Sequence, residues 1–361
     1  MYLTFKGVTG LVLLCVLMAC GKGDKAATYG EDFFYLRNNG ADMPVFVEGN
    51  FDSNTFIVVL HGGPGGNDQI YNSGLSVLSD SLEILYRMVY YDQRGSGTAS
   101  GNYSNNEVQV NQYVNDLSAL IQVLHNKYGN DITLFLMGHS WGGTLGTAYL
   151  IDENRQNAIT GWIEVDGAHN FLYAPHIIEN IINIGTTQIS VGNHIDEWQT
   201  IVDFAEGLNP NEVSSTDLST LNQHGYTGEG YLLNDGILTS DAVTIDPLQY
   251  LSDGISHSLN SPYNPLTGTI NMLFTNNAFL NAITSGTLNF SDDLHKITIP
   301  CAFFWGKYDM VVPIADGYDA FDKVSTDEKR MVVFESSGHS PMINETNRFL
   351  EELIDFVETY Q

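Results

Sequence analysis

The sequence predicts an α/β protein: a mostly parallel sheet with helices on both faces, interrupted by an inserted and mainly helical cap. Strand-like and helix-like segments alternate from Glu31 onward, a pattern typical of parallel sheets covered on both faces. The alternation breaks near Gly167 and resumes near Leu294, and no Lys or Arg occurs between Gln156 and His295. The expected parts are a first core segment at 31–167, the cap at 168–290 and a second core segment at 291–361.

Short apolar runs mark the expected core strands, and apolar residues spaced three or four apart mark the helices. In the first core segment we expect a hairpin at 33–37 and 44–48, strands at 56–60, 87–91, 132–136 and 161–165, and helices at 70–79 and 107–128. In the cap we expect helices at 177–184 and 196–206. In the second core segment we expect strands at 298–305 and 329–334 and a closing amphipathic helix at 343–359.

The N-terminus has the features of a targeting segment. Lys6 precedes an apolar run at 11–18 that is too short to span a bilayer. The run ends in Leu-Met-Ala-Cys at Cys20, which resembles the bacterial lipobox, where the cysteine is lipidated and becomes the mature N-terminus. We therefore expect a lipoprotein signal peptide at 1–20, a tether at 21–30, anchoring to a membrane through the lipid and a location in the bacterial cell envelope. An ordinary secretory signal is the alternative.

Composition excludes several classes of partner and cofactor. The formal net charge of -29, from 14 Lys+Arg against 43 Asp+Glu, repels nucleic acid and anionic membrane faces, so we expect neither as a direct partner. Cys301 is the one cysteine expected in the folded part, and its apolar neighbours predict a buried, inert thiol without a disulfide. No His-Glu-x-x-His or paired-cysteine pattern occurs, so we expect no metal and no other cofactor.

The candidate nucleophile is Ser140. It lies in Gly138-His139-Ser140-Trp141-Gly142, between a strand-like and a helix-like segment. In that context Gly-x-Ser-x-Gly is the nucleophile elbow, a strained turn that lifts the serine hydroxyl above the edge of the sheet. A capping serine in an ordinary turn is the alternative, but the flanking strand and helix favour a nucleophile.

A serine nucleophile needs a neutral imidazole as base and a carboxylate that orients this imidazole. In hydrolases built on such sheets the three residues follow in the order serine, acid, histidine. Asp309 comes just after the strand expected to end at Trp305, and His339 follows the strand expected to end at Phe334. Because both loops lie at the carboxyl edge of the sheet, we expect Ser140, Asp309 and His339 to form a catalytic triad.

A glycine-rich stretch at 61–66 follows the strand that ends at Leu60. In this architecture such a loop supplies one backbone N–H to an oxyanion hole, and the residue after the nucleophile supplies the other. We therefore expect Gly63 and Trp141 as the oxyanion donors. A phosphate-binding loop is the alternative, but the Lys-Ser/Thr ending of a P-loop is missing, and the stretch at 92–97 lacks dinucleotide-binding spacing.

Three motifs together resemble the proline iminopeptidase (prolyl aminopeptidase) family of α/β-hydrolases. They are His-Gly-Gly-Pro-Gly at 61–65, Asp-Gln-Arg-Gly-Ser-Gly at 92–97 and Gly-His-Ser-Trp-Gly-Gly at 138–143. The resemblance covers about 45–165 and 295–345. It implies the α/β-hydrolase fold with a helical cap, and a serine peptidase that removes an N-terminal residue, often proline, from short peptides through an acyl-enzyme. It also implies that the 92–97 loop is mainly structural.

The sequence departs from this family at two points. The family often has Gly-Gly-Ser-Trp-Gly at the elbow, whereas His139 is shared with broader hydrolases such as esterases and lactonases. For the family's amine-recognising glutamates the candidates are Glu206, in a segment similar to a Trp-Glu-Gly of the family, and Glu229; both also fit solvated surface acids. A carboxylic ester or lactone hydrolase and a lipid-anchored binding protein without turnover therefore remain alternatives, and the expected substrate is a small peptide or ester.

Overall fold

The structure is a computed structural model that describes residues 28–72, 75–103, 108–241 and 288–361. The expected signal peptide, Cys20 and most of the tether lie outside the described residues, as does the part of the cap at 242–287. Within the described ranges, no helix has the length and apolar character needed to cross a membrane.

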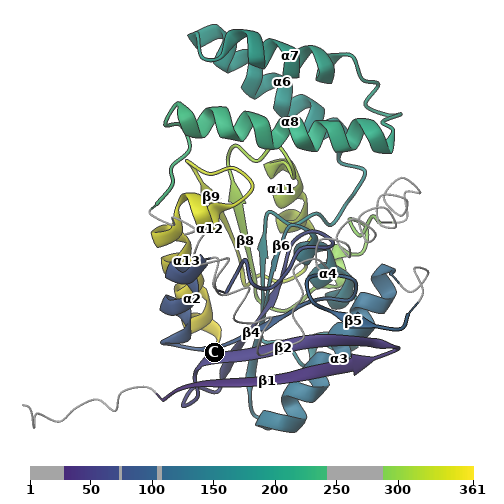
Figure 1. Cartoon of the computed structure of the whole chain (residues 1–361), viewed down its shortest axis with the longest axis vertical. Helices are drawn as coiled ribbons and strands as arrows, with labels where there is room; N and C mark the ends of the chain where they lie inside the picture. The colour runs from purple at the N-terminus through teal and green to yellow at the C-terminus, as the bar shows by residue number, and fades with distance from the viewer. Residues whose placement is uncertain (1–27, 73–74, 104–107, 242–287) are drawn as a thin grey trace, which may run out of the picture.

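The described residues contain a nine-stranded sheet at the centre of the molecule (Figure 1). Its order is β1-β2-β4-β3-β6-β7-β8-β9, with the short β5 paired to β2. From β4 to β9 all neighbouring strands are parallel, whereas β2 pairs antiparallel with β1, β4 and β5. The bounds are β1 (Tyr29–Asn38), β2 (Ala41–Asn50), β3 (Thr55–Leu60), β4 (Arg87–Tyr91), β5 (Ser100–Gly101), β6 (Thr133–His139), β7 (Gly161–Val165), β8 (Cys301–Gly306) and β9 (Lys329–Phe334).

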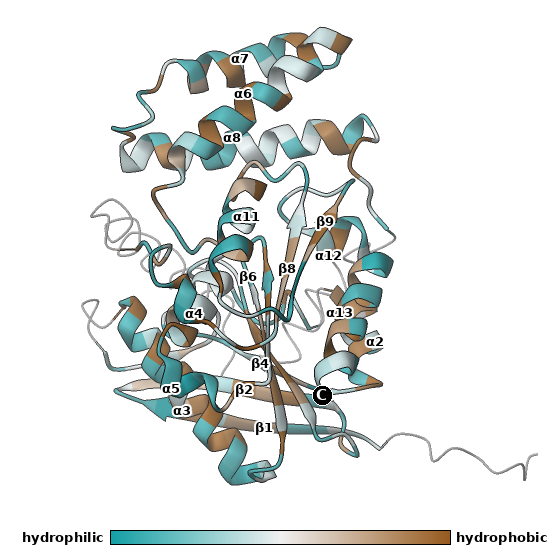
Figure 2. Ribbon diagram, turned by 180° about the vertical axis from the view of Figure 1, so that it is seen from behind, coloured by the Kyte–Doolittle hydropathy of each residue, from teal (hydrophilic) through white to brown (hydrophobic). Residues whose placement is uncertain are grey.

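Helices cover both faces of this sheet (Figure 2). Along β3, Phe56, Val58 and Leu60 pack into one apolar core, while Ile57 and Val59 pack into a second core on the opposite face, because successive side chains of a strand point to opposite faces. The first core includes α3 (Val110–Tyr128), α4 (Trp141–Leu150) and α11 (Ile314–Lys323), and the second includes α2 (Ser76–Glu83) and α13 (Thr346–Tyr360). The mostly parallel α/β architecture expected from the sequence is confirmed.

Two helix predictions near the sheet were wrong in detail. The helix expected at 70–79 begins only at Ser76, as α2. The closing helix expected at 343–359 is two helices, α12 (Pro341–Asn344) and α13, because Glu345 has non-helical dihedral angles, with φ -125 and ψ 55. Glu345 Oε2 accepts hydrogen bonds from the Ser336 N–H and the Ser337 hydroxyl, so the break ties the closing helices to the loop after β9.

Three helices stand above the carboxyl edge of the parallel strands (Figure 1). They are α6 (Ala174–Val191), α7 (Ile195–Glu206) and α8 (Ser215–Asn234), which follow β7 in the chain. The sequence indicated α6 and α7 but not α8, because glycines at 225, 228 and 230 lower its helix propensity. Two of these glycines allow close packing: a Cβ on Gly225 would lie 2.7 Å from the Met310 carbonyl oxygen, and a Cβ on Gly228 2.6 Å from the Trp198 ring.

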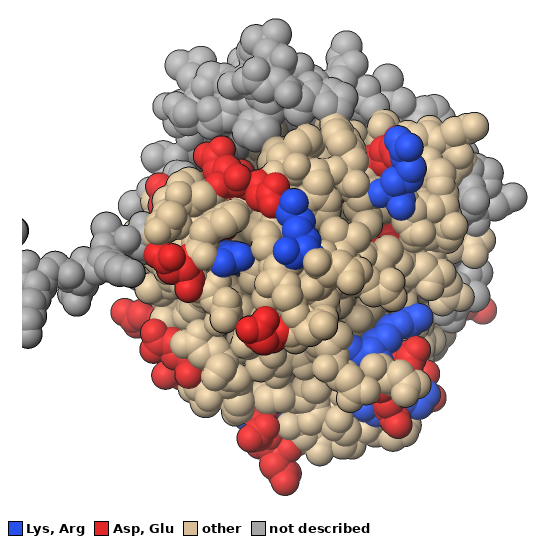
Figure 3. Space-filling view, turned by 90° about the horizontal axis from the view of Figure 1, so that it is seen from below, with Lys and Arg blue, Asp and Glu red and all other residues tan. Residues whose placement is uncertain are grey.

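Charge is distributed unevenly over the molecule. The three described cap helices contain no Lys or Arg. On the face seen in Figure 3, at the end of the sheet opposite these helices, Lys and Arg side chains lie among acidic ones. Cys301, in β8, is buried and free, as expected, and burial raises the pKa of its thiol.

Candidate active site

Ser140 lies in a strained turn between β6 and α4. Its φ is 55 and its ψ is -118, a backbone conformation that non-glycine residues rarely adopt. The glycines on either side make the turn possible, because a Cβ on Gly142 would lie 1.9 Å from the Leu60 carbonyl oxygen and a Cβ on Gly138 2.4 Å from the Gly142 carbonyl oxygen. The turn therefore has the geometry of a nucleophile elbow.

The structure brings Ser140, His339 and Asp309 together. The distance from His339 Nε2 to Ser140 Oγ is 3.0 Å, and that from His339 Nδ1 to Asp309 Oδ2 is 2.8 Å. Asp309 Oδ1 accepts the backbone N–H groups of Val311 and Val312, each at 2.8 Å. Because the carboxylate can only accept, Nδ1 carries the imidazole proton, and Nε2 is left to accept the proton of the serine hydroxyl.

The charge of Asp309 controls the basicity of His339. Burial by itself would lower the pKa of His339, but the charge of Asp309 and its hydrogen bond outweigh burial, and the pKa is raised above its usual value. The charge of Glu229 adds to the rise. An imidazole of this kind is a stronger base, and its charged form is stabilised when it takes the serine proton.

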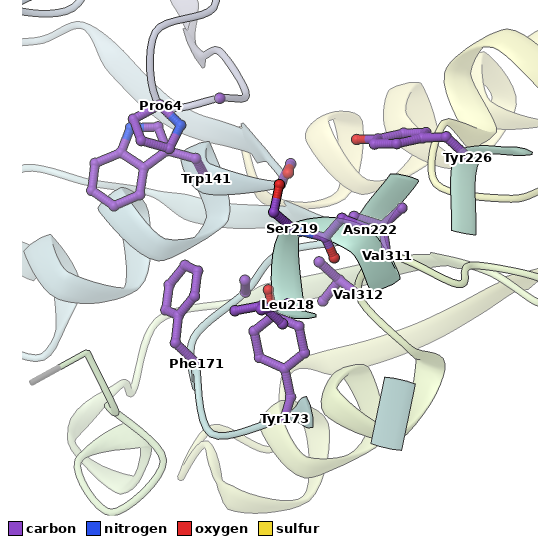
Figure 4. A pocket seen from close by; sticks show the side chains of 13 residues that line it. Pro64, Trp141, Phe171, Tyr173, Leu218, Ser219, Asn222, Tyr226, Val311 and Val312 are labelled. Carbon is purple, nitrogen blue, oxygen red and sulfur yellow. The ribbon is translucent and has the colours of Figure 1, made fainter. Parts of the chain in front are cut away.

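A cavity of about 220 Å³ opens beside Ser140. Gly63 and Trp141, the expected oxyanion donors, both line it. Most of the remaining lining residues are apolar or aromatic, but polar atoms, including those of side chains from α8, make up more than half of the exposed cavity surface (Figure 4). These other residues are Pro64, Ala168, Phe171, Tyr173, Leu218, Ser219, Asn222, Tyr226, Val311 and Val312.

The loop at 92–97 supports two segments that border this cavity. The Gln93 side chain donates to the His61 carbonyl oxygen at 3.1 Å and accepts the indole N–H of Trp141 at 2.8 Å. It thus links the glycine-rich loop to the nucleophile elbow. Arg94 is buried and pairs with the buried Asp116 at 2.8 Å, so its charge is directed into the core rather than toward the cavity.

His139 contacts the triad without belonging to it. Its Nε2–H donates to the His339 carbonyl oxygen at 2.7 Å, and its Nδ1 accepts the Tyr71 hydroxyl at 2.6 Å. Burial and the neighbouring His339 lower the pKa of His139 to about 3, so the ring stays neutral. The sequence analysis did not identify Tyr71, which also accepts the Gly62 N–H at 3.1 Å, because a tyrosine 68 residues before His139 carries no motif signal.

The structure separates the two candidate glutamates. Glu229 reaches from α8 to the triad, where Oε2 accepts the His339 N–H at 3.1 Å and Oε1 accepts the Met310 N–H at 3.3 Å. Burial and the nearby Asp309 raise the pKa of Glu229 to about 7. Glu206 is exposed at the end of α7, and neither glutamate is among the residues that line the cavity beside Ser140.

Comparisons with known proteins agree with this geometry. Residues 55–346 match the family described as the alpha/beta hydrolase fold. The chain is 24% identical to a probable aminopeptidase, YbaC, of Bacillus subtilis (strain 168) over 91% of this chain and 94% of that protein. It is 26% identical to a proline iminopeptidase of Saccharolobus solfataricus over 85% of this chain and 86% of that protein.

A solved structure shares the fold. An esterase from Exiguobacterium antarcticum superposes with a TM-score of 0.53 at 20% identity, over 90% of this chain and 98% of that one. The family match spans most of the chain, including the strands and loops that carry Ser140, Asp309 and His339. The chain therefore belongs to the α/β-hydrolase fold family and is a serine hydrolase.

Proposed function

We propose that the protein is a serine aminopeptidase that releases an N-terminal residue of the proline type from short peptides. The observation that carries this proposal is the position of Glu229. Its carboxylate is bound to the backbone of the triad histidine. Glu229 lies seven residues after Asn222 and three after Tyr226 on α8, close to two helical turns and one, so it is on the same side of the helix as these two cavity-lining residues. A carboxylate there suits a protonated substrate amine next to the scissile bond.

The proposed mechanism uses the triad in the usual order. Ser140 attacks the scissile carbonyl while His339 takes its proton, and Asp309 stabilises the imidazolium. The backbone N–H groups of Gly63 and Trp141 bind the oxyanion of the tetrahedral intermediate. His339 then gives its proton to the leaving amine, and a water molecule activated by the same imidazole hydrolyses the acyl-enzyme.

The cavity supports a small apolar residue at the cleavage site. Its volume of about 220 Å³ is below the range of about 300–1,000 Å³ of drug-sized ligand pockets. Phe171 and Tyr173 offer aromatic surface, and Val311 and Val312 offer aliphatic surface. A cyclic, apolar side chain such as that of proline matches this lining better than a long or charged one.

A substrate panel tests the proposal. We expect hydrolysis of a prolyl arylamide with a free amine and strong loss of activity when the amine is acetylated. Glu229→Gln should lower kcat/KM for the free amine by roughly ten- to a hundredfold, the range for losing a hydrogen bond to a charged group. Glu206→Gln, which changes an exposed acid of the same cap, is the matched control and should retain activity. Equal rates on free and acetylated substrates would rule out the aminopeptidase.

The second candidate is a carboxylic ester or lactone hydrolase. It is favoured by the cavity lining, in which no charged side chain occurs among the described residues. The same panel separates the two functions, because an esterase would prefer short-chain esters and be indifferent to amine acetylation.

We further propose that the protein is a lipoprotein of the bacterial cell envelope, held on a membrane by a lipid on Cys20. The support is the sequence itself: a short apolar run that ends in a lipobox-like Leu-Met-Ala-Cys. The first described strand, β1, begins at Tyr29, so a short segment would join the lipid to the folded domain.

A further inference from the structure

A second buried aspartate lies beside the triad acid. Asp166 directly follows β7 and is fully buried. Its φ is 44, and it is one of four non-glycine residues with positive φ among the residues described; Ser140 is another. Aspartate adopts positive φ more readily than most residues. Two of the four residues with positive φ therefore lie in the active site.

The hydrogen bonds of Asp166 leave one carboxyl oxygen unused. Oδ1 accepts the Gly306 N–H at 2.9 Å. Oδ2 is buried and accepts no hydrogen bond from the residues that the structure describes. The Asp309 N–H donates to the Gly306 carbonyl oxygen at 3.2 Å, so both aspartates bind the backbone of Gly306, and their carboxyl groups interact with each other. Two carboxylates in such contact cannot both be ionised at neutral pH, because their like charges repel in a site that excludes water. One of them must hold a proton.

The donors around each carboxyl decide which one is protonated. Asp309 accepts three N–H groups, from Val311, Val312 and His339, and each stabilises its charged form. Among the described residues, Asp166 accepts one N–H group, that of Gly306. Burial and the charge of Asp309 accordingly raise the pKa of Asp166 well above its ordinary value.

We propose that Asp166 is a positioning residue of the triad: it stays protonated at neutral pH and donates its O–H to the Asp309 carboxylate. This inference rests on the proposed role of Asp309 as the triad acid. The donated hydrogen bond fixes the carboxylate that orients His339. Because Asp166 is neutral, it adds no second negative charge that would hold a proton on His339.

Other titratable groups also face this pair. Glu229 and Tyr226 approach from α8, Tyr173 lies at the start of α6, and His339 lies in the loop after β9. The pKa values of both tyrosines are raised by burial, so they are neutral near pH 7. Of the groups named here, Glu229 is thus the acid whose charge changes near neutrality, since its pKa is about 7. The pH profiles of Asp166 variants therefore need a Glu229→Gln background as a reference.

Two variants of Asp166 test the proposal. Asparagine reproduces a protonated aspartate, since its oxygen can accept the Gly306 N–H and its NH₂ can donate to Asp309; alanine removes the donor. The measurement is the rate at which a fluorophosphonate labels Ser140 across pH, which does not depend on the natural substrate. We expect Asp166→Ala to be labelled at least about tenfold more slowly than the unaltered protein. Asp166→Asn should be labelled at nearly the unaltered rate, and the acid limb of its pH profile should have the same midpoint as that of the unaltered protein.

An ionised Asp166 would give a different pH profile of labelling. If Asp166 were ionised, Asp166→Asn would remove a buried charge close to His339 and move the acid limb to lower pH by about one unit or more. That shift, or equal losses in both variants, would overturn the proposal. Thermal melting of each variant shows whether Asp166→Ala loses activity because it unfolds, and in that case the pH profile of Asp166→Asn decides.

An infrared difference spectrum locates the proton directly. The spectrum of the unaltered protein minus that of Asp166→Asn at pH 7 should contain the carbonyl band of a protonated carboxyl group. A carboxylate band in its place would overturn the proposal. This result is independent of turnover: a protein that shows no labelling at all would contradict the serine hydrolase, whereas the infrared band would still decide the protonation of Asp166.

Discussion

At the scale of single residues, two histidines stand side by side and only one can act as a base. The ring centroids of His139 and His339 are 5.0 Å apart. Both ring nitrogens of His139 are engaged, by Tyr71 and by the His339 carbonyl oxygen, whereas His339 Nε2 faces the hydroxyl of Ser140. The hydrogen bonds therefore assign the base to His339 and a supporting role to His139.

This assignment predicts unequal effects of alanine substitutions. His339→Ala should lower kcat by about 10³-fold or more, because triad members act as one unit. His139→Ala should lose far less, since it removes only a brace of the His339 backbone. Steady-state kinetics of both variants check the prediction, and comparable losses would contradict it.

The pH dependence of activity follows from the same contacts. His339 must be neutral to take the serine proton, so activity falls as the pH drops through its pKa. Since Asp309 raises that pKa, we expect the acid limb of kcat/KM to have its midpoint above about 6.5, the ordinary value for histidine. Asp309→Asn should lower kcat steeply and move the residual limb to lower pH. A limb unaffected by this substitution would show that another group controls it.

At the scale of elements, α8 determines how the cap meets the triad. It carries Glu229 to the His339 backbone and packs closely on Met310, next to Asp309. A Cβ on Gly338 would lie 2.2 Å from Glu229 Oε2, so the glycine in the histidine loop makes room for this contact. The helix is thus positioned by the loops that hold the triad.

The glycines of α8 give a matched test of this packing. A Cβ on Gly225 would meet the Met310 carbonyl oxygen, whereas no atom of the described part of the chain lies within 4 Å of the corresponding position at Gly230. Gly225→Ala should destabilise the protein by about 1–3 kcal/mol through overpacking, with a lower kcat. Gly230→Ala should stabilise it by up to about 1 kcal/mol, because alanine favours a helix. Thermal unfolding of both variants measures the contrast, and effects of the same sign would contradict it.

At the scale of the whole molecule, the proposed lipid on Cys20 would determine where the enzyme works. If Cys20 carries the lipid, Cys20→Ser should move the protein from the detergent-requiring membrane fraction into soluble or unprocessed forms. Stable anchoring takes two lipid chains or one chain with a polybasic patch. In this acidic chain, with a formal net charge of -29, loss of the modified cysteine should therefore release the protein almost completely. Fractionation of cells that express each form checks this, and an unchanged distribution would identify a plain secretory signal.

Local patterns in the sequence were sufficient to predict much of the fold and of the site. The strands expected at 87–91, 161–165 and 329–334 coincide with β4, β7 and β9. Short apolar runs bounded by turns mark such strands, and β7 is buried along its whole length. The three residues expected as a triad follow strand ends, and the ends of parallel strands converge at one edge of the sheet. The order of Ser140, Asp309 and His339 along the chain, and the position of each after a strand, were therefore enough to predict that they lie together.

Only the tertiary structure decided the surroundings of these residues. The helix α8 lacks a clear apolar period, and its glycines are explained by contacts with Met310 and Trp198. Asp166 binds Gly306, 140 residues away in the sequence, and Glu229 binds His339, 110 residues away. Such contacts depend on close approach and on the exclusion of water, which raise the pKa of a buried carboxyl group. A sequence records which side chains are present, but the folded chain determines which of them share a proton.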